Sequence, residues 1–309
     1  MSISSPSPRV CPPQAQPPWH GIARLQFTAA DGVTSHQGLA TAPLKLQRSF
    51  QQRDGRRELP LLHTAGGLVG GDRLSVELQL APGSRALLTS VAAQKVYGSV
   101  GRSRRAPAGS WAVQELNVQV GAGADLEWLP QELVLYANGL FEQRAQVELA
   151  QGASYLGAEV VRLGRSAAGE TLGSGRWRSQ LEIRRHTANG LRWELVDRLE
   201  LGGEALEGEH GMAGEAVFGS LVWAAPEPLA GAALKALLTT CRDARVGLDG
   251  AMACGALEQG LVARYRGPSS QAARHWFTRI WALTRQQRGL PAPELPRVWP
   301  FQEQPFGSA

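Results

Sequence analysis

The chain has 309 residues, 43% of them hydrophobic and 19% charged, which is the composition of a folded globular protein rather than a disordered one. Its 36 glycines and 19 prolines argue against a largely helical fold and favour a protein of many strands and turns. A formal net charge of +5 is too small an excess to indicate a nucleic-acid-binding protein.

The first 18 residues are rich in Pro, Ser and Gln, and they predict an extended, flexible arm ahead of a single domain over residues 19–309. This arm lacks the apolar region of a signal peptide, and no apolar run in the chain approaches the length of a membrane span. The three cysteines form no C-x-x-C pair, which is typical of a reducing compartment. We therefore expect a cytoplasmic protein.

Between residues 19 and 80 the pattern predicts short strands with polar turns. Residues 72–80 alternate cleanly, so that Leu74, Val76, Leu78 and Leu80 should face the core. A weak internal repeat then follows at residues 80–90, 120–130 and 149–159, where one strand ends, a glycine turn intervenes and another strand begins. This repeat predicts a layered fold in which one sheet lies on another.

Farther along the chain, further strands are expected near residues 176–185, 191–201, 217–224, 245–248 and 257–266. Two helices are expected, at 229–240 and 269–288. The longer helix should begin at a serine cap and end at Gly289, with its aromatic stripe against a sheet and with Arg274, Arg285 and Arg288 in water. The proline-rich tail that follows predicts an irregular strap. The fold class is therefore mainly β, a layered, solenoid-like sheet protein with two flanking helices, the longer near the C-terminus.

The most unusual segment is HTAGGLVGGD, residues 63–72, in which two Gly-Gly pairs flank Leu68-Val69. The paired glycines predict sharp turns or a close approach to another surface, and the segment lacks the spacing of a phosphate-binding loop. One interpretation is a double glycine turn between strands that Asp72 caps. Catalysis based on His63 is the weaker interpretation, because a lone histidine is usually structural.

Two later segments carry isolated charges. Lys95 comes at the end of an expected strand, before a flexible loop, and an edge-strand charge is its simplest interpretation. Glu132 lies within an apolar stretch, so if it is buried it must be protonated or paired, with Lys95 or an arginine as its partner.

The sequence contains few motifs that indicate catalysis or metal binding. There is no G-x-S-x-G elbow and no H-E-x-x-H motif, and the acidic loop around residues 204–212 is better explained by solvation than by a tight metal site. Two alternatives stay open at this point, a β-sandwich hydrolase and a nucleic-acid-binding β protein.

Five segments resemble, in matching order, the UreD family of urease accessory proteins, called UreH in some organisms. They are HTAGGLVGGD (63–72), LAPGSRALLTSVAAQKVYGS (80–99), EWLPQE (127–132), GRSAAGE (164–170), and the C-terminal helix with the following PRVW (296–299). The resemblance extends from about residue 20 to residue 300.

This resemblance implies a β-rich, helix-flanked chaperone rather than an enzyme. Such a protein binds apo-urease and, with UreF and the GTPase UreG, delivers nickel to the urease active site. The nucleotide chemistry belongs to the partner, so no tightly bound metal or cofactor is expected, only nickel in transit through a water-filled route. Our candidate residues for this polar route are His63, Asp72, Lys95, Glu132 and Glu170.

Candidate partner-binding residues come from two places. Where the family often has an arginine after the tyrosine, Gly98 stands here, and the following loop supplies Arg102, Arg104 and Arg105. The aromatic stripe of the longer helix supplies Trp276, Phe277 and Ile280, which either belong to the core or dock UreF. The core interpretation is the simpler one.

Overall fold

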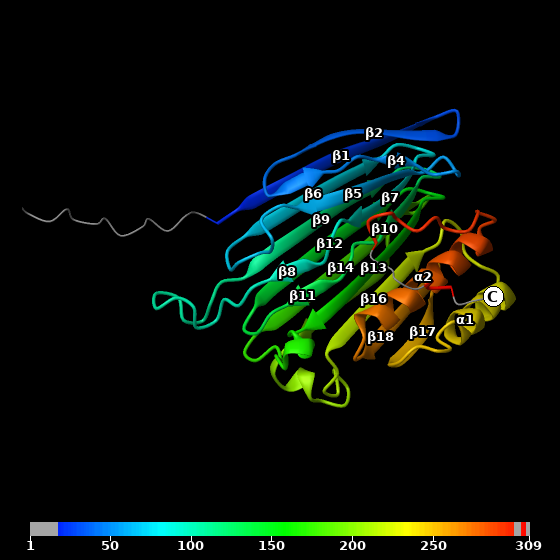
Figure 1. The fold of residues 1–309 in the computed structure, drawn as a ribbon. Helices are drawn as coiled ribbons and strands as arrows, with labels where there is room; N and C mark the ends of the chain where they lie inside the picture. Colours follow the sequence, from blue (N-terminus) through cyan, green and yellow to red (C-terminus); the bar gives the residue numbers. More distant parts are fainter. Residues whose placement is uncertain (1–17, 300–303, 307–309) are drawn as a thin grey trace, which may run out of the picture.

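A computed structural model describes residues 18–299 and 304–306, so nearly all of the expected N-terminal arm lies outside the described residues. Within these ranges the fold is mainly β, with two large sheets in layers and two helices against one of them (Figure 1). We call the seven-stranded sheet of this part sheet A and the eleven-stranded one sheet B. The expected layered fold with two flanking helices is confirmed.

The strand orders are as follows. Sheet A runs β15 (Gly190–Leu201), β14 (Arg176–Thr187), β12 (Leu140–Leu149), β9 (Ala112–Val120), β6 (Arg73–Leu80), β1 (His20–Ala30) and β2 (Val33–Ala40). Sheet B runs β17 (Ala251–Leu257), β18 (Gly260–Gly267), β16 (Val217–Ala224), β13 (Ser154–Leu163), β10 (Asp125–Trp128), β7 (Arg85–Ser90), β5 (Arg57–His63) and β3 (Leu44–Leu46). Beside this path, β11 (Leu133–Leu135) pairs with β13 and β8 (Gln94–Val96), and β4 (Phe50–Gln51) pairs with β5.

The central strands of both sheets are parallel, because the chain passes repeatedly from sheet A to sheet B through a tight turn. β6 leads into β7, β9 into β10 and β12 into β13, which are the three units of the internal repeat. The three turns contain Gly83, Gly123 and Gly152 at φ of 70°, 63° and 69°, a conformation that strains other residues. Successive turns also touch, since the Gly83 N–H donates to the Ala122 carbonyl at 2.9 Å.

The unequal spacing of the repeat has a simple cause. The loop from β8 to β9 occupies residues 97–111, whereas the chain passes from β11 to β12 within residues 136–139. The repeat is therefore a regular stack of strands with one long loop inserted at its edge.

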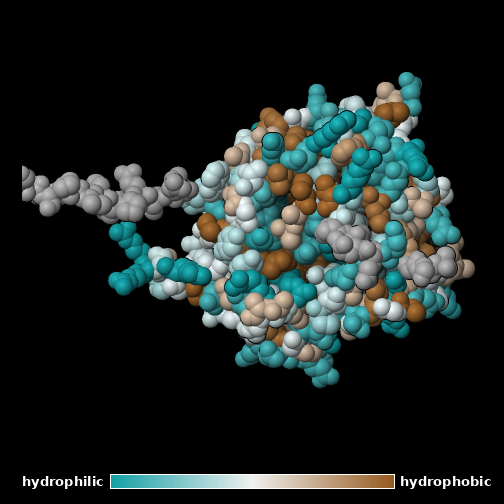
Figure 2. All heavy atoms as spheres, viewed as in Figure 1, coloured by the Kyte–Doolittle hydropathy of each residue, from teal (hydrophilic) through white to brown (hydrophobic). Residues whose placement is uncertain are grey.

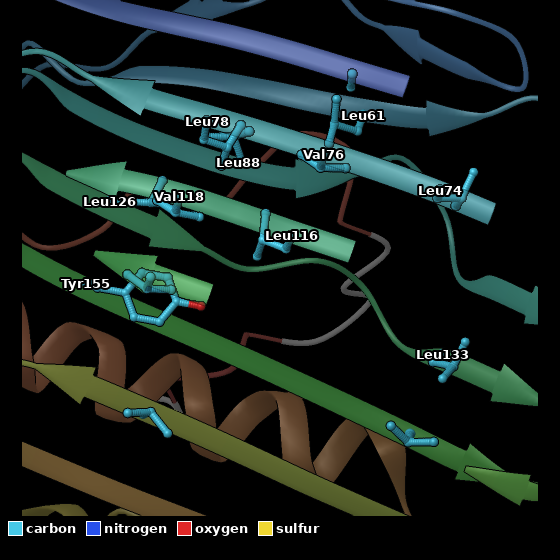
Figure 3. Close-up of a cluster of buried hydrophobic side chains, with 14 of the residues drawn as sticks. Leu61, Leu74, Val76, Leu78, Leu88, Leu116, Val118, Leu126, Leu133 and Tyr155 are labelled. Atoms are coloured by element: carbon cyan, nitrogen blue, oxygen red, sulfur yellow. The ribbon is translucent and has the colours of Figure 1, made fainter. Parts of the chain in front are cut away.

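The core between the sheets follows from strand alternation. Leu74, Val76, Leu78 and Leu80 of β6 are each at most 4% exposed, as predicted. Figure 3 shows side chains of β6 and β9 directed toward those of sheet B, among them Leu88 and Leu126. Apolar burial on this scale is the main force that holds the two layers together.

The helices α1 (Gly231–Asp243) and α2 (Ser270–Gln287) form a second core against the outer face of sheet B. The Ser269 hydroxyl caps α2 by accepting from the Ala272 N–H at 3.1 Å, and Gly289 follows its end at a φ of 66°. Both ends of α2 are as predicted. Within the described ranges, neither helix combines the length and apolarity needed to cross a membrane.

Three expectations about the C-terminal third are wrong. Residues 245–248 form turns after α1 rather than a strand, and Val246 is 76% exposed. The strand expected at 257–266 begins only at Gly260, after a turn that follows β17. Arg274, Arg285 and Arg288 were expected in water, but their side chains are 13%, 2% and 17% exposed, because carboxylates beneath α2 hold all three guanidinium groups.

Candidate functional site

Sheet B is interrupted in its middle, and the interruption opens into a cavity between the sheets. Residues 91–93, between β7 and β8, are not in a strand, and neither are residues 129–132, between β10 and β11. A cavity of about 290 Å³ lies behind these breaks, and its exposed lining residues Gly66, Ala92 and Lys95 mark the opening. The space-filling view in Figure 2 shows apolar surface among hydrophilic patches on the face toward the viewer.

His63, at the end of β5, lines this cavity. Its side chain is half-buried, and its Nε2 atom has no hydrogen-bond partner among the described residues. Burial lowers the pKa of the imidazole, although the negative charge of Asp72 acts in the opposite direction. The ring is therefore neutral at physiological pH, and one of its nitrogens carries a lone pair that a divalent cation can use.

The inner end of the cavity is polar. Glu159 of β13 points between the sheets, and the Ser179 hydroxyl of β14 lies 3.3 Å from its Oε1. Burial raises the pKa of Glu159 to about 7; Arg264 and the Ser179 hydrogen bond oppose this rise, and Asp197 adds to it. Glu159 is partly buried, and it lines both this cavity and a second one.

A smaller cavity of about 60 Å³ adjoins the first. The two share several lining residues, including Gln114, Gln143 and Glu159. Beyond Glu159 the smaller cavity is lined by Ser179 and Ser220. Polar side chains therefore follow the interior from the opening at His63 toward β14 and β16.

The glycine segment 63–72 supports the wall of this cavity. A Cβ atom on Gly67 would lie 2.6 Å from the Tyr97 ring, and one on Gly70 would lie 2.3 Å from the Ser99 hydroxyl. Only glycine allows this close approach, as the sequence predicted. Asp72 is buried and accepts from the Trp19 and Val69 N–H groups, each at 2.9 Å, so its carboxylate caps the turn.

Glu132 faces α2 rather than the cavity. Its carboxylate lies 2.9 Å from Arg274 Nη1 in a largely buried ion pair. An arginine was one of the two predicted kinds of partner, and Lys95 is instead an exposed residue at the cavity opening.

Glu170 closes the loop after β13. It forms an ion pair with Arg165, and the Ala137 N–H donates to its Oε1 at 2.9 Å. These two bonds lower the pKa of Glu170 to about 2, the bond to Arg165 contributing most. The Arg165 guanidinium also lies over the Tyr136 ring, 4.6 Å from its centre. The GRSAAGE motif thus ties a loop to β11 and its neighbours.

Comparison with known proteins shows to which family this chain belongs. The family model described as UreD urease accessory protein matches residues 20–300. A urease accessory protein UreD of Synechococcus sp. (strain CC9902) is 63% identical over 289 residues, covering 94% of this chain and 93% of that protein. The UreD of Prochlorococcus marinus (strain MIT 9303) is 60% identical over 294 residues, covering 93% and 98%.

The chain belongs to the UreD family. The motifs that carry the resemblance have structural roles in this fold. The glycine segment builds the cavity wall, EWLPQE crosses the break in sheet B, and GRSAAGE closes the loop after β13. Two of these motifs, the glycine segment and EWLPQE, contribute residues to the lining of the larger cavity.

The two groups of candidate partner residues lie in different surroundings. Arg102, Arg104 and Arg105 are exposed on the loop between β8 and β9. Trp276, Phe277 and Ile280 are at most 3% exposed and pack between α2 and sheet B. The arginine loop therefore offers charge at the surface, whereas the helix stripe fills the core.

The sequence missed a buried cluster of charges between sheet B and α2, on the face away from the cavity. Three arginines and three carboxylates form it: Asp54, Arg56, Asp125, Glu127, Arg285 and Arg288. Although burial alone would raise it, Arg56 and Arg288 hold the pKa of Asp125 well below its usual range. Glu159 was also missed, even though it is the carboxylate that faces the cavity.

Proposed function

We propose that this UreD family member is a non-enzymatic chaperone of urease maturation that conducts nickel through its interior. In this proposal it binds apo-urease in the cytoplasm and, together with UreF and the GTPase UreG, supports GTP-dependent delivery of nickel to the urease active site. The observation that carries the proposal is the polar interior of two adjoining cavities, open at the break in sheet B and containing Glu159.

The chemistry of the lining suits passage of a cation better than its retention. His63 offers an imidazole nitrogen near the opening, and Glu159 offers a carboxylate at the inner end. Between them the lining is polar, from the amides of Gln114 and Gln143, and the Gln143 oxygen accepts from the Trp177 indole N–H at 2.7 Å. A few dispersed nitrogen and oxygen ligands bind a divalent ion weakly, so the ion is released again.

The proton occupancy of Glu159 controls its charge. Its pKa of about 7 means that protons and nickel compete for the same carboxylate near neutral pH. Loading is therefore favoured above pH 7, where Glu159 is ionised, and release is favoured as the pH falls. The remaining carboxylates among our candidates, Asp72, Glu132 and Glu170, hold the walls of the route through their hydrogen bonds and ion pairs.

The exposed arginine loop is the part of the surface that we assign to a partner. Three guanidinium groups on one loop, Arg102, Arg104 and Arg105, attract an acidic surface and speed its association. Replacing all three with Gln should weaken capture of apo-urease or UreF, and the weakening should shrink at high salt.

The test of the function uses cells that carry urease and its accessory proteins but lack this chain. Restoring the chain should restore nickel in purified urease, and Glu159→Ala should lower that nickel without loss of the chaperone–urease complex. The control is Glu77→Gln, which alters an exposed ion pair with Arg24 on the outer face of sheet A. Urease that fills with nickel equally well without the chain would refute the proposal.

A further inference from the structure

The chain after α2, which we call the C-terminal strap (residues 289–299), lies against the outer side of the interrupted part of sheet B. In Figure 1 this red segment passes in front of β10. Along it, Glu294 meets the β4–β5 turn, since its Oε1 accepts from the Arg53 N–H at 3.2 Å. The strap therefore runs from the end of α2 toward the opening of the larger cavity.

The end of the strap bonds to two residues that line the cavity. The Trp299 indole N–H donates to the Thr89 hydroxyl at 2.7 Å, and the Val298 carbonyl accepts from Gln131 Nε2 at 3.0 Å. Thr89 and Gln131 both belong to the lining. The strap thus touches the rim of the opening from outside while the cavity meets the same residues from inside.

Gln131 joins the two sides of the break in sheet B. Its Nε2 lies 2.9 Å from the Ser90 carbonyl and 2.8 Å from the Val91 carbonyl, and its backbone N–H donates to the Ser90 hydroxyl at 2.9 Å. Ser90 and Val91 stand on the β7 side of the opening, and Gln131 follows β10. One buried amide therefore fixes both edges of the break and the strap together.

Trp299 also connects the rim to α2. Its ring centre lies 6.0 Å from that of Trp281, and the Arg274 guanidinium lies 5.6 Å from the same indole. Arg274 in turn pairs with Glu132, next to Gln131. The rim is therefore connected to α2 through packed aromatic and ionic contacts.

We propose that Gln131 and Trp299 are positioning residues that hold the opening of the cavity in its narrow form, and that release of the strap widens it. That the strap holds the opening follows from these contacts alone, whereas the importance of the opening for nickel delivery rests on the proposed function. The strap gives α2 control over how readily a cation reaches His63 and the interior.

The test measures access to the cavity with a reporter cysteine in the full chain. Gln114→Cys places a thiol on the interior side of β9, and Asn117→Cys places one on the exposed outer face of the same strand. The rate of alkylation by a small maleimide is followed at each position by mass spectrometry, which separates these thiols from the native cysteines. No nickel or partner is needed.

Two variants loosen the rim, Thr89→Val with its packing kept and Trp299→Phe with part of its ring packing lost. Trp299→Phe keeps a ring but loses the indole N–H, and Thr89→Val keeps the shape of the side chain but loses the hydroxyl. Each should raise the alkylation rate at residue 114 about 2- to 10-fold, the effect of one lost hydrogen bond, and leave residue 117 unchanged. Gln131→Ala, which removes several bonds, should raise it further.

Arg297→Ala is the matched control within the strap, because its guanidinium stacks on Phe50 rather than on a lining residue. It should leave alkylation at residue 114 unchanged. Unchanged rates in the Trp299, Thr89 and Gln131 variants would overturn the inference even if their melting temperatures fall, since a purely structural role predicts only that fall. Such a result leaves the nickel proposal standing, because that proposal fails only on the nickel content of urease.

Discussion

Replacement of Glu159 with Gln tests the most unusual electrostatic feature of the interior. The ordinary pKa of this carboxyl is 4.5, and burial raises it to about 7 in the folded chain. At about 1.4 kcal/mol per unit, the difference corresponds to at most about 3 to 4 kcal/mol of unfolding free energy. The Glu159 side chain is only partly buried, and solvent screening reduces this figure. Gln keeps the shape and polarity of the side chain and removes the titration.

The sign of the effect follows from which state holds the proton. At and below pH 4.5 the carboxyl is largely protonated in the folded chain, so folding buries no charge at this position. As the pH rises toward 7, the unfolded chain loses this proton while the folded chain keeps it, so the stability that the raised pKa provides is lost. Glu159→Gln should therefore match the parent at pH 5 more closely than at pH 8, where it should be more stable by up to about 3 to 4 kcal/mol.

Urea unfolding at pH 5, 6, 7 and 8 measures this difference directly. Glu77→Gln serves as the control, because a surface ion pair contributes less than about 1 kcal/mol and should leave the pH profile unaltered. If the stability difference between Glu159→Gln and the parent is the same at all four pH values, Glu159 does not titrate as a buried cavity carboxyl and the reasoning is wrong.

Three further changes test contacts that stabilise the fold. Arg285→Leu deprives two buried carboxylates of a partner and should lower the unfolding free energy by about 3 to 5 kcal/mol in urea titrations. The control Arg24→Leu breaks an exposed ion pair and should lower it by less than about 1 kcal/mol. Equal losses in the two variants would show that the Arg285 ion pairs are no more important than a surface pair. Ser269→Ala removes the cap of α2 and should cost about 1 kcal/mol, whereas an unchanged melting temperature would show that the cap is dispensable. Gly67→Ala forces a Cβ against the Tyr97 ring and should cost about 1 to 3 kcal/mol; a neutral result would mean that the wall relaxes freely.

Features set by neighbouring residues were predictable from the sequence. Alternation placed the four inward residues of β6, the glycine turns marked the passages between sheets, and Ser269 with Gly289 bounded α2. The strand predicted at residues 245–248 is absent, because a short apolar pattern after a helix does not reveal whether a partner strand is available. β17, built mainly from small residues, gives a weak signal of its own.

The candidate site was only partly predictable. His63 and the glycine segment were singled out by their composition, and both belong to the cavity. Glu159 was missed because an acidic residue within a strand has no special pattern, and its inward direction is defined only once β13 pairs within sheet B. The pairing of Arg285 with Glu127 joins residues far apart in sequence, and no local signal reveals that contact.

The central claim is that nickel reaches urease through the interior of this chain. Gln114→Trp places an indole where both cavities meet, while Gln114→Ala leaves that space open. The deciding measurement is the nickel content of urease purified from cells that make each variant, with recovery of the chaperone–urease complex checked alongside. We expect nickel to fall sharply with Trp and to stay normal with Ala. Full nickel loading in the presence of an intact Trp variant would contradict the account.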